Sequence, residues 1–154
     1  MKKKFIYPMD FGVLTIAEVD GIITDLTVHG VKDGIEEETL VIKEAYHQLK
    51  DYLAGARNEF DLPLAPQGTE FQKQVWQALQ TIPYGETRSY KDIAIQIGNP
   101  KASRAIGMAN NKNPIFIVIP CHRVIGANGK LVGYGGGLDL KQRLLKLETK
   151  SDIS

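Results

Sequence analysis

The sequence has a single cysteine, no long apolar run and almost no net charge. The lone Cys121 excludes an internal disulfide and a cysteine-rich zinc site. The longest apolar run, residues 115–119, is far shorter than the roughly 20 residues that a membrane helix needs. The lysine-rich N-terminus does not continue into the apolar stretch of a secretory signal. We therefore expect a soluble, cytoplasmic protein with no membrane partner.

The small net charge of +1 conceals an asymmetry between the two parts of the chain. Residues 1–66 contain seven Lys and Arg against twelve Asp and Glu, whereas residues 67–154 contain twelve against six. A basic half indicates an anionic partner. Chance clustering of solvated charges explains the asymmetry equally well at this point.

The 154 residues suit one domain or two small ones, and the first part is typical of strands followed by a helix. β-Rich segments over residues 11–19 and 22–28 are separated by Asp20-Gly21, a strong hairpin signal. Residues 36–54 change to a helical period, with their apolar positions mostly on one face. The Pro- and Gly-containing segment 56–68 predicts a linker between two domains.

The second part contains two helix starts with capping boxes. Thr69 is followed three residues later by Gln72, and Ser89 is followed three residues later by Asp92. In this pattern each side chain can satisfy a backbone amide of the first helical turn. We therefore expect helices to begin near residues 70 and 90.

The helix expected over residues 90–97 is followed by Gly98 and a third predicted helix from Pro100 to about Ala109. Two short helices joined by a tight glycine-containing turn predict a helix-turn-helix. Lys101 and Arg104 on the second helix fit DNA contact, although a plain corner between two core helices explains the pattern as well.

Together these patterns predict an α+β protein with two parts. Residues 1–66 are expected to form a small N-terminal α/β domain and linker, with an antiparallel hairpin sheet and a helix. Residues 67–154 are expected to form a mostly helical C-terminal domain that contains the helix-turn-helix and ends in a helix over residues 138–148.

Cys121, His122 and Arg123 follow directly after the apolar run 115–119, which we interpret as a buried extended segment. Polar residues at the end of such a segment suit a reactive site, because a thiolate is a strong nucleophile and a neighbouring base raises its fraction. Adjacent residues of an extended chain point to opposite faces, so His122 need not touch Cys121 directly and could act through a water. An inert buried thiol and a core histidine are the alternatives.

The segment Ile119-Pro120-Cys121-His122-Arg123-Val124 resembles the active-site signature of the O6-alkylguanine-DNA alkyltransferases, also called methylated-DNA–protein-cysteine methyltransferases. The resemblance covers residues 69–148 well, and residues 1–65 in general character only. Further motifs fall in family order: Ser89-Tyr90, Gly98-Asn99-Pro100, Arg104-Ala105-Ile106-Gly107, Asn113-Pro114, Gly133-Tyr134, and Leu144-Leu145 with Glu148.

The resemblance implies a DNA repair enzyme that works on duplex DNA. Proteins of this family remove alkyl groups from O6 of guanine, and less readily from O4 of thymine. The cysteine thiolate displaces the alkyl group and keeps it, so each molecule works once and needs no cofactor. A target base inside a duplex is out of reach, so the nucleotide must be flipped out.

The resemblance also assigns catalytic roles to matching positions. Cys121 is the expected nucleophile, and His122 takes its proton through a water, with the imidazole oriented by Glu148. Tyr90 is expected to donate a hydrogen bond to the departing guanine. Asn113 is expected to lie near the thiol and to brace the helix-turn-helix.

The DNA-binding residues and the base pocket follow in the same way. Arg104 is expected to fill the stack that the flipped base leaves, on a helix inserted into the minor groove. The remaining expected DNA-binding residues are Ser89, Lys101, Ala102 and Ser103, and the expected pocket residues are Pro120, Val124, Tyr134, Gly135 and Gly136.

The chain departs from some relatives, and other functions stay open. Its N-terminal part has no cysteine and only His29 and His47, so we expect no zinc; position 135 is glycine where some relatives carry serine. We expect a monomer whose partner is duplex DNA containing O6-alkylguanine. The alternatives are a sensor of alkylated DNA, a thiol hydrolase that uses Cys121, His122 and Glu148, or a transcription regulator, for which 154 residues leave no room for an added domain.

Overall fold

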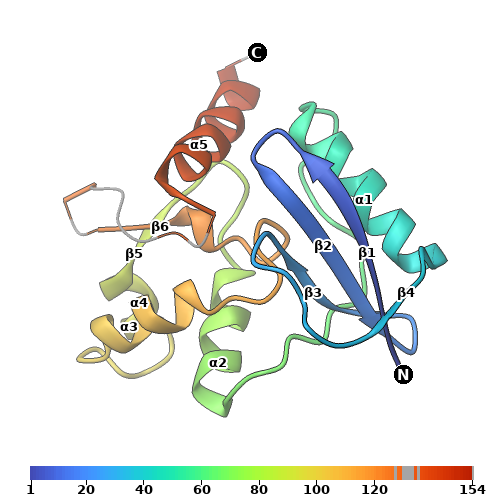
Figure 1. Cartoon of the computed structure of the whole chain (residues 1–154). Helices are drawn as coiled ribbons and strands as arrows, with labels where there is room; N and C mark the ends of the chain where they lie inside the picture. The colour runs from blue at the N-terminus through green and yellow to red at the C-terminus, as the bar shows by residue number, and fades with distance from the viewer. Residues whose placement is uncertain (127, 130–133, 135, 154) are drawn as a thin grey trace. The chain divides into compact units, whose positions relative to one another are not determined.

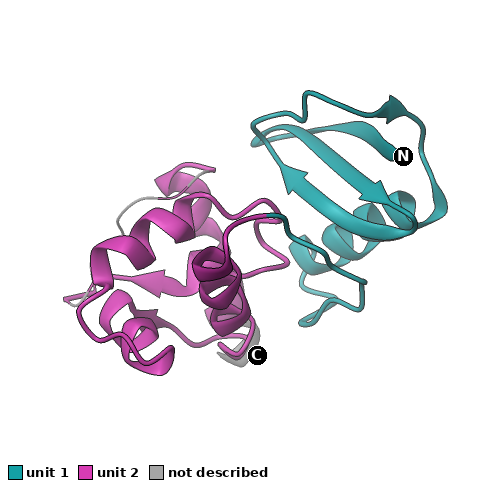
Figure 2. Cartoon of the chain, turned by 90° about the horizontal axis from the view of Figure 1, so that it is seen from below, with its two compact units in different colours: residues 1–67 teal, residues 68–154 magenta. Residues whose placement is uncertain are grey.

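The computed structural model describes the whole chain except residues 127, 130–133, 135 and 154. The chain forms two compact units, residues 1–67 and 68–154 (Figure 2). The first unit contains a sheet and one helix, and the second is mostly helical, which confirms the predicted α+β class.

The first unit has a sheet with the strand order β3-β2-β1-β4, and α1 packs on one face of this sheet (Figure 1). β1–β2 and β2–β3 pair antiparallel, and β4 joins β1 in parallel. Asp20 and Gly21 have φ of 52° and 81°, as a two-residue hairpin turn requires, so the predicted hairpin is confirmed. The elements are β1 (Lys2–Met9), β2 (Gly12–Val19), β3 (Ile22–Thr27), β4 (Ile35–Glu36) and α1 (Leu40–Leu53).

The sequence did not predict β1 or β4. Three consecutive lysines hide the strand character of β1, and the structure neutralises two of them with acidic neighbours. Lys2 pairs with Asp25 at 3.1 Å and Lys3 with Glu37 at 3.0 Å. These ion pairs form only after folding, so local sequence could not show them.

The helix predicted over residues 36–54 begins later, because Thr39 accepts a hydrogen bond from the Ile42 amide and caps it. The half-buried Tyr46 of α1 stacks its ring on Tyr7 of β1, with centroids 3.8 Å apart. The predicted linker is also partly structured. Ile23 exchanges backbone hydrogen bonds with Pro63 and Ala65, so this segment extends the first unit.

The second unit contains α2 (Glu70–Leu79), β5 (Arg88–Ser89), α3 (Tyr90–Gln96), α4 (Ser103–Asn111), the 3₁₀ turn η1 (Cys121–Arg123), β6 (Val124–Ile125) and α5 (Leu138–Ile153). Both predicted capping boxes are present at Thr69–Gln72 and Ser89–Asp92. Parallel pairing of β5 with β6 places the start of α3 beside the end of η1.

Three sequence expectations in this unit were wrong. The helix predicted from Pro100 begins at Ser103, because residues 99–102 form a turn in which the Ala102 amide donates to Asn99 O at 3.0 Å. Residues 115–119 are buried except for the half-buried Val118, but they form a tight turn instead of an extended segment, with Ile119 N donating to Ile115 O at 3.0 Å. The last helix continues beyond 148, to Ile153.

Candidate active site

Cys121 is the first residue of η1 and is only 3% exposed. Its position is fixed by the backbone on both sides: its amide donates to Ile119 O at 2.8 Å, and its carbonyl accepts from Asn110 Nδ2 of α4 at 3.3 Å. The 3₁₀ geometry corrects the expectation that Cys121 and His122 are neighbours on an extended chain. The thiol therefore lies at a turn held between α4 and the tight turn 115–119.

Burial raises the pKa of the Cys121 thiol to about 11. Several groups oppose this shift: the Asn113 side chain, the Lys141 charge, and the backbone amides of Cys121 and Ile117. At neutral pH the group is a protonated thiol surrounded by groups that favour the thiolate. A nearby base is therefore needed to remove the proton.

His122 is fully buried, and its Nε2 lies 2.7 Å from Oε2 of Glu148, which α5 contributes. Burial lowers the pKa of His122, and the Glu148 carboxylate opposes this shift. The imidazole is therefore neutral at pH 7 and can accept a proton. The structure brings Cys121, His122 and Glu148 into one buried region, while their catalytic roles stay predictions.

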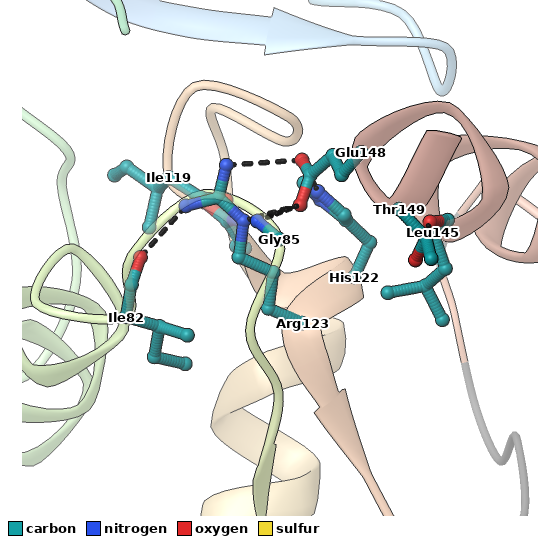
Figure 3. A network of polar contacts seen from close by, with 9 residues as sticks. Ile82, Gly85, Ile119, His122, Arg123, Leu145, Glu148 and Thr149 are labelled. Atoms are coloured by element: carbon teal, nitrogen blue, oxygen red, sulfur yellow. Dashed lines mark hydrogen bonds and ion pairs between the residues drawn. The ribbon is translucent and has the colours of Figure 1, made fainter. Parts of the chain in front are cut away.

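Arg123 completes this network, although no role was predicted for it from the sequence. Its Nε and Nη2 donate to Oε1 and Oε2 of Glu148 at 2.8 and 2.9 Å, and its Nη1 donates to the Ile82 carbonyl at 2.7 Å (Figure 3). One buried carboxylate is thus shared by a guanidinium and an imidazole. Because the Arg contact is bidentate, the carboxylate is held in one orientation.

Lys141 was also missed by the sequence analysis. It is completely buried, and its Nζ donates to the Val124 carbonyl at 2.6 Å. Burial lowers the pKa of this amine, and the Cys121 thiolate opposes the shift. The spacing of Lys141, Leu144 and Glu148 is the signal that could have revealed it, because i, i+3 and i+7 share one face of a helix.

Ile117 has a backbone conformation that is rare for a branched side chain. Its φ is 72°, and its side chain is only 1% exposed. Branched residues in this left-handed region are strained, and such strain concentrates at functional sites. The neighbouring Val118 amide donates to Phe116 O at 2.9 Å, whereas the Ile117 amide hydrogen-bonds to Cys121. The strained turn therefore contributes an amide to the surroundings of the thiol.

Asn113 and Tyr90 both lie close to the thiol. Asn113 Nδ2 donates to Ile119 O at 2.8 Å, its Oδ1 accepts from the Ile115 amide at 3.0 Å, and its side chain hydrogen-bonds to Cys121. Asn113 thus braces the turn 115–119. Burial, and then the charge of Cys121, raise the pKa of Tyr90, so its phenol stays protonated as a hydrogen-bond donor.

The expected DNA-binding residues lie at or before the start of α4, apart from Ser89. Arg104 and Lys101 are exposed, whereas Ala102 and Ser103 are partly buried. Because α4 begins at Ser103, Lys101 precedes the helix. The Ser89 hydroxyl accepts from the Asp92 amide at 3.0 Å and so serves as the cap of α3.

The expected pocket residues are only partly brought together. Tyr134 lies near Phe116, with ring centroids 6.1 Å apart. A Cβ at Gly136 would lie 2.9 Å from Leu140 Cδ2 and 3.0 Å from the Phe116 ring, so any side chain there would have to displace these neighbours. Pro120 and Val124 are buried and flank η1 on either side, and Gly135 lies outside the described residues. A cleft of about 190 Å³ beside Glu148 is lined by other residues: Gly85, Thr87, Ile125, Gly129, Leu145 and Thr149.

Within the described part of the chain, no cluster of His, Cys, Asp and Glu could hold a metal ion. Within the same residues, no helix is long and apolar enough to cross a membrane.

Residues 70–150 match the family model described as 6-O-methylguanine DNA methyltransferase, DNA binding domain. The chain belongs to this family. It is 64% identical over 118 residues to a methylated-DNA–protein-cysteine methyltransferase of Methanosarcina acetivorans, covering 77% of this chain and 76% of that one. It is 56% identical over 144 residues to the protein of that name from Mycolicibacterium paratuberculosis, covering 90% and 87%.

Solved structures agree with this family membership. The crystal structure of Mycobacterium tuberculosis O6-methylguanine methyltransferase superposes with a TM-score of 0.89 at 46% identity, covering 98% of this chain and 94% of that one. The structure of M. tuberculosis OGT in complex with DNA gives a TM-score of 0.90 at 47% identity, covering 97% and 94%. The resemblance stated from the signature around Cys121 is confirmed, and the chain is an alkyltransferase of DNA repair.

Proposed function

We propose that this alkyltransferase moves the alkyl group of O6-alkylguanine, and less readily of O4-alkylthymine, from duplex DNA to its own Cys121, once per molecule. The observation that supports this most directly is the buried Cys121 thiol next to the neutral His122 and its partner Glu148. The proposal needs no cofactor, because the cysteine sulfur itself accepts the group.

In the proposed reaction the Cys121 thiol gives its proton to His122 through a water. The thiolate Sγ attacks the alkyl carbon, an S–C bond forms, and the bond between that carbon and guanine O6 breaks with its electron pair on the base. The leaving guanine takes up one proton from water, and His122 returns to water the proton that it took from Cys121, so the protons balance. The Tyr90 phenol donates a hydrogen bond to the guanine while negative charge develops on it. The product is a thioether, which has no ionisable proton and is a poor leaving group. The reaction therefore stops after one transfer.

Access to the lesion requires the nucleotide to leave the base stack. We propose that α4 enters the minor groove and that the exposed Arg104 occupies the vacated space, with Lys101, Ala102, Ser103 and the Ser89 region at the DNA backbone. Tyr134, Gly135 and Gly136 are proposed to line the base pocket, with Val124 and Pro120 shaping it from the η1 side. We further propose that residues 67–154 carry both functions and that the protein acts as a monomer.

The stoichiometry of transfer tests the proposal. A duplex with one labelled O6-methylguanine, in large excess, should transfer one methyl group per protein and then no more. Peptide mass spectrometry should find the added mass on Cys121. Continued turnover would contradict the single-use reaction, and binding without any added mass would favour the sensor of alkylated DNA. Hydrolysis of a simple thioester by Cys121 would favour the thiol hydrolase.

Arg104→Ala should slow repair of a methylated duplex by roughly tenfold or more, because extrusion costs a few kcal/mol that the arginine offsets. Reaction with free O6-benzylguanine, which needs no extrusion, should stay close to wild type. Single-turnover rates on both substrates measure the difference. Lys101→Ala is the matched control, since loss of one phosphate contact should reduce affinity and its salt dependence only. If Arg104→Ala lowered the rates on both substrates equally, Arg104 would have no role in base flipping.

A further inference from the structure

Arg123 is a buried cation, and each of its three guanidinium nitrogens donates a hydrogen bond. Nε and Nη2 hold the two oxygens of Glu148 at 2.8 and 2.9 Å, and Nη1 holds the Ile82 carbonyl at 2.7 Å. The guanidinium also lies 5.7 Å from the centre of the Tyr84 ring. Figure 3 shows the side chain reaching Glu148 on one side and Ile82 on the other. A planar guanidinium group that is in contact on several sides has little freedom to move.

The carboxylate that pairs with the Arg123 guanidinium is the Glu148 carboxylate that also contacts His122. Glu148 Oε2 accepts from Arg123 Nη2 and lies 2.7 Å from His122 Nε2, while Oε1 accepts from Arg123 Nε and from the Gly85 amide at 3.4 Å. A buried carboxylate that contacts a bidentate guanidinium is ionised. An ionised carboxylate only accepts hydrogen bonds. The proton in the contact between Oε2 and Nε2 therefore belongs to the histidine.

This assignment determines which nitrogen can act as a base. A neutral imidazole has one N–H, and when that proton is on Nε2 the acceptor nitrogen is Nδ1. We propose that Arg123 is a positioning residue of alkyl transfer, which holds Glu148 as an oriented anion and so fixes His122 as the Nε2–H tautomer whose Nδ1 receives the Cys121 proton. The proposal rests on the proposed function of Cys121.

The charges around His122 indicate what loss of Arg123 would do. The groups that influence it are Glu148 and Lys141 of α5 and Arg123 of η1; the Glu148 charge raises the pKa of His122, whereas the two cations lower it. The Cys121 thiol next to it is protonated at neutral pH and adds no charge. Without Arg123 only Lys141 opposes the effect of the Glu148 charge, so the pKa of His122 rises. A larger fraction of the histidine is then protonated and cannot act as a base.

The test uses the full chain labelled with ¹⁵N-histidine, in the wild type, Arg123→Met and Arg123→Lys. Ring ¹⁵N shifts report the tautomer and the pKa of each histidine, and the signal absent from His122→Gln identifies His122 among the three histidines. Single-turnover methyl transfer is measured against pH on the same samples. Arg123→Lys is the matched control, because it keeps a positive charge but loses the bidentate contact.

We expect wild-type His122 to be the Nε2–H tautomer and neutral at pH 7. In Arg123→Met its pKa should rise by about one unit or more, and the acid limb of the rate profile should move up with it. One pH unit below the new pKa only about a tenth of His122 is neutral, so the transfer rate of Arg123→Met there should be about tenfold lower than its own rate at high pH. Arg123→Lys should keep most of the wild-type pKa.

Three outcomes would overturn the proposal. The first is a wild-type His122 with its proton on Nδ1, which needs no variant and so holds even if Arg123→Met does not fold. The second is an unchanged pKa and tautomer in folded Arg123→Met, which is the result of a packing role alone. The third is an Arg123→Lys variant whose His122 shifts as far as in Arg123→Met. The histidine spectra require no DNA, so a wild type that accepts no methyl group would contradict the function of Cys121 separately.

Discussion

Cys121→Ser is expected to abolish methyl transfer from O6-methylguanine DNA and to leave binding of the same duplex unchanged. A hydroxyl is far less ionised than a thiol, and a neutral His122 whose pKa is lowered by burial is too weak a base to remove its proton. The hydroxyl fits the volume that the thiol occupies, so the 3% exposed site keeps its shape. Labelled-methyl transfer and gel-shift titrations at two salt concentrations measure the two properties.

Cys121→Ala is the control for this prediction. It removes the nucleophile without adding a buried hydroxyl, and it should match the serine variant in both measurements. Methyl transfer that survives in either variant would exclude Cys121 as the acceptor. Loss of DNA binding in both would show that the thiol supports the position of α4, which Asn110 connects to the Cys121 carbonyl, and that the loss of transfer is indirect.

The features that local sequence predicted correctly are those with local causes. The capping boxes at Thr69 and Ser89 and the hairpin at Asp20-Gly21 each depend on residues within three positions of one another. β1 and the true start of α4 depend on partners or turns that a short sequence window does not contain. The three lysines of β1 are typical of a solvated segment until the acidic partners of Lys2 and Lys3 are placed beside them.

The candidate site divides in the same way. The signature around Cys121 pointed to the buried region that contains this thiol and His122, and the resemblance supplied Glu148, which is 26 residues from His122 and contacts it. The two buried charged residues of that region, Arg123 and Lys141, were not predicted to take part in it. Arg123 and Lys141 are charged residues, which sequence patterns normally place on the surface, and their burial follows from a carboxylate and a carbonyl that tertiary packing brings to them. The left-handed Ile117 has no signal in the sequence, because branched residues normally avoid that region.

Glu148→Leu is expected to lower the free energy of unfolding by about 3–5 kcal/mol, because it leaves the buried Arg123 guanidinium without its carboxylate. For a unit of this size, each kcal/mol corresponds to a shift of roughly 4–8 °C in Tm. The same change removes the hydrogen-bond acceptor of His122 Nε2, so methyl transfer by the folded fraction should also fall. Urea unfolding and single-turnover transfer below the new Tm measure the two effects.

The double variant Arg123→Met with Glu148→Leu separates stability from chemistry. Replacing both partners of a buried ion pair by apolar residues of similar volume is often neutral, since no charge is left without a partner. The double variant should therefore regain most of the stability that Glu148→Leu loses, while transfer stays as low as in the single variant. If transfer returned together with stability, Glu148 would serve only to neutralise Arg123. If neither returned, the destabilisation of Glu148→Leu would have a cause other than an unpaired Arg123, such as loss of the contact between Glu148 and the Gly85 amide.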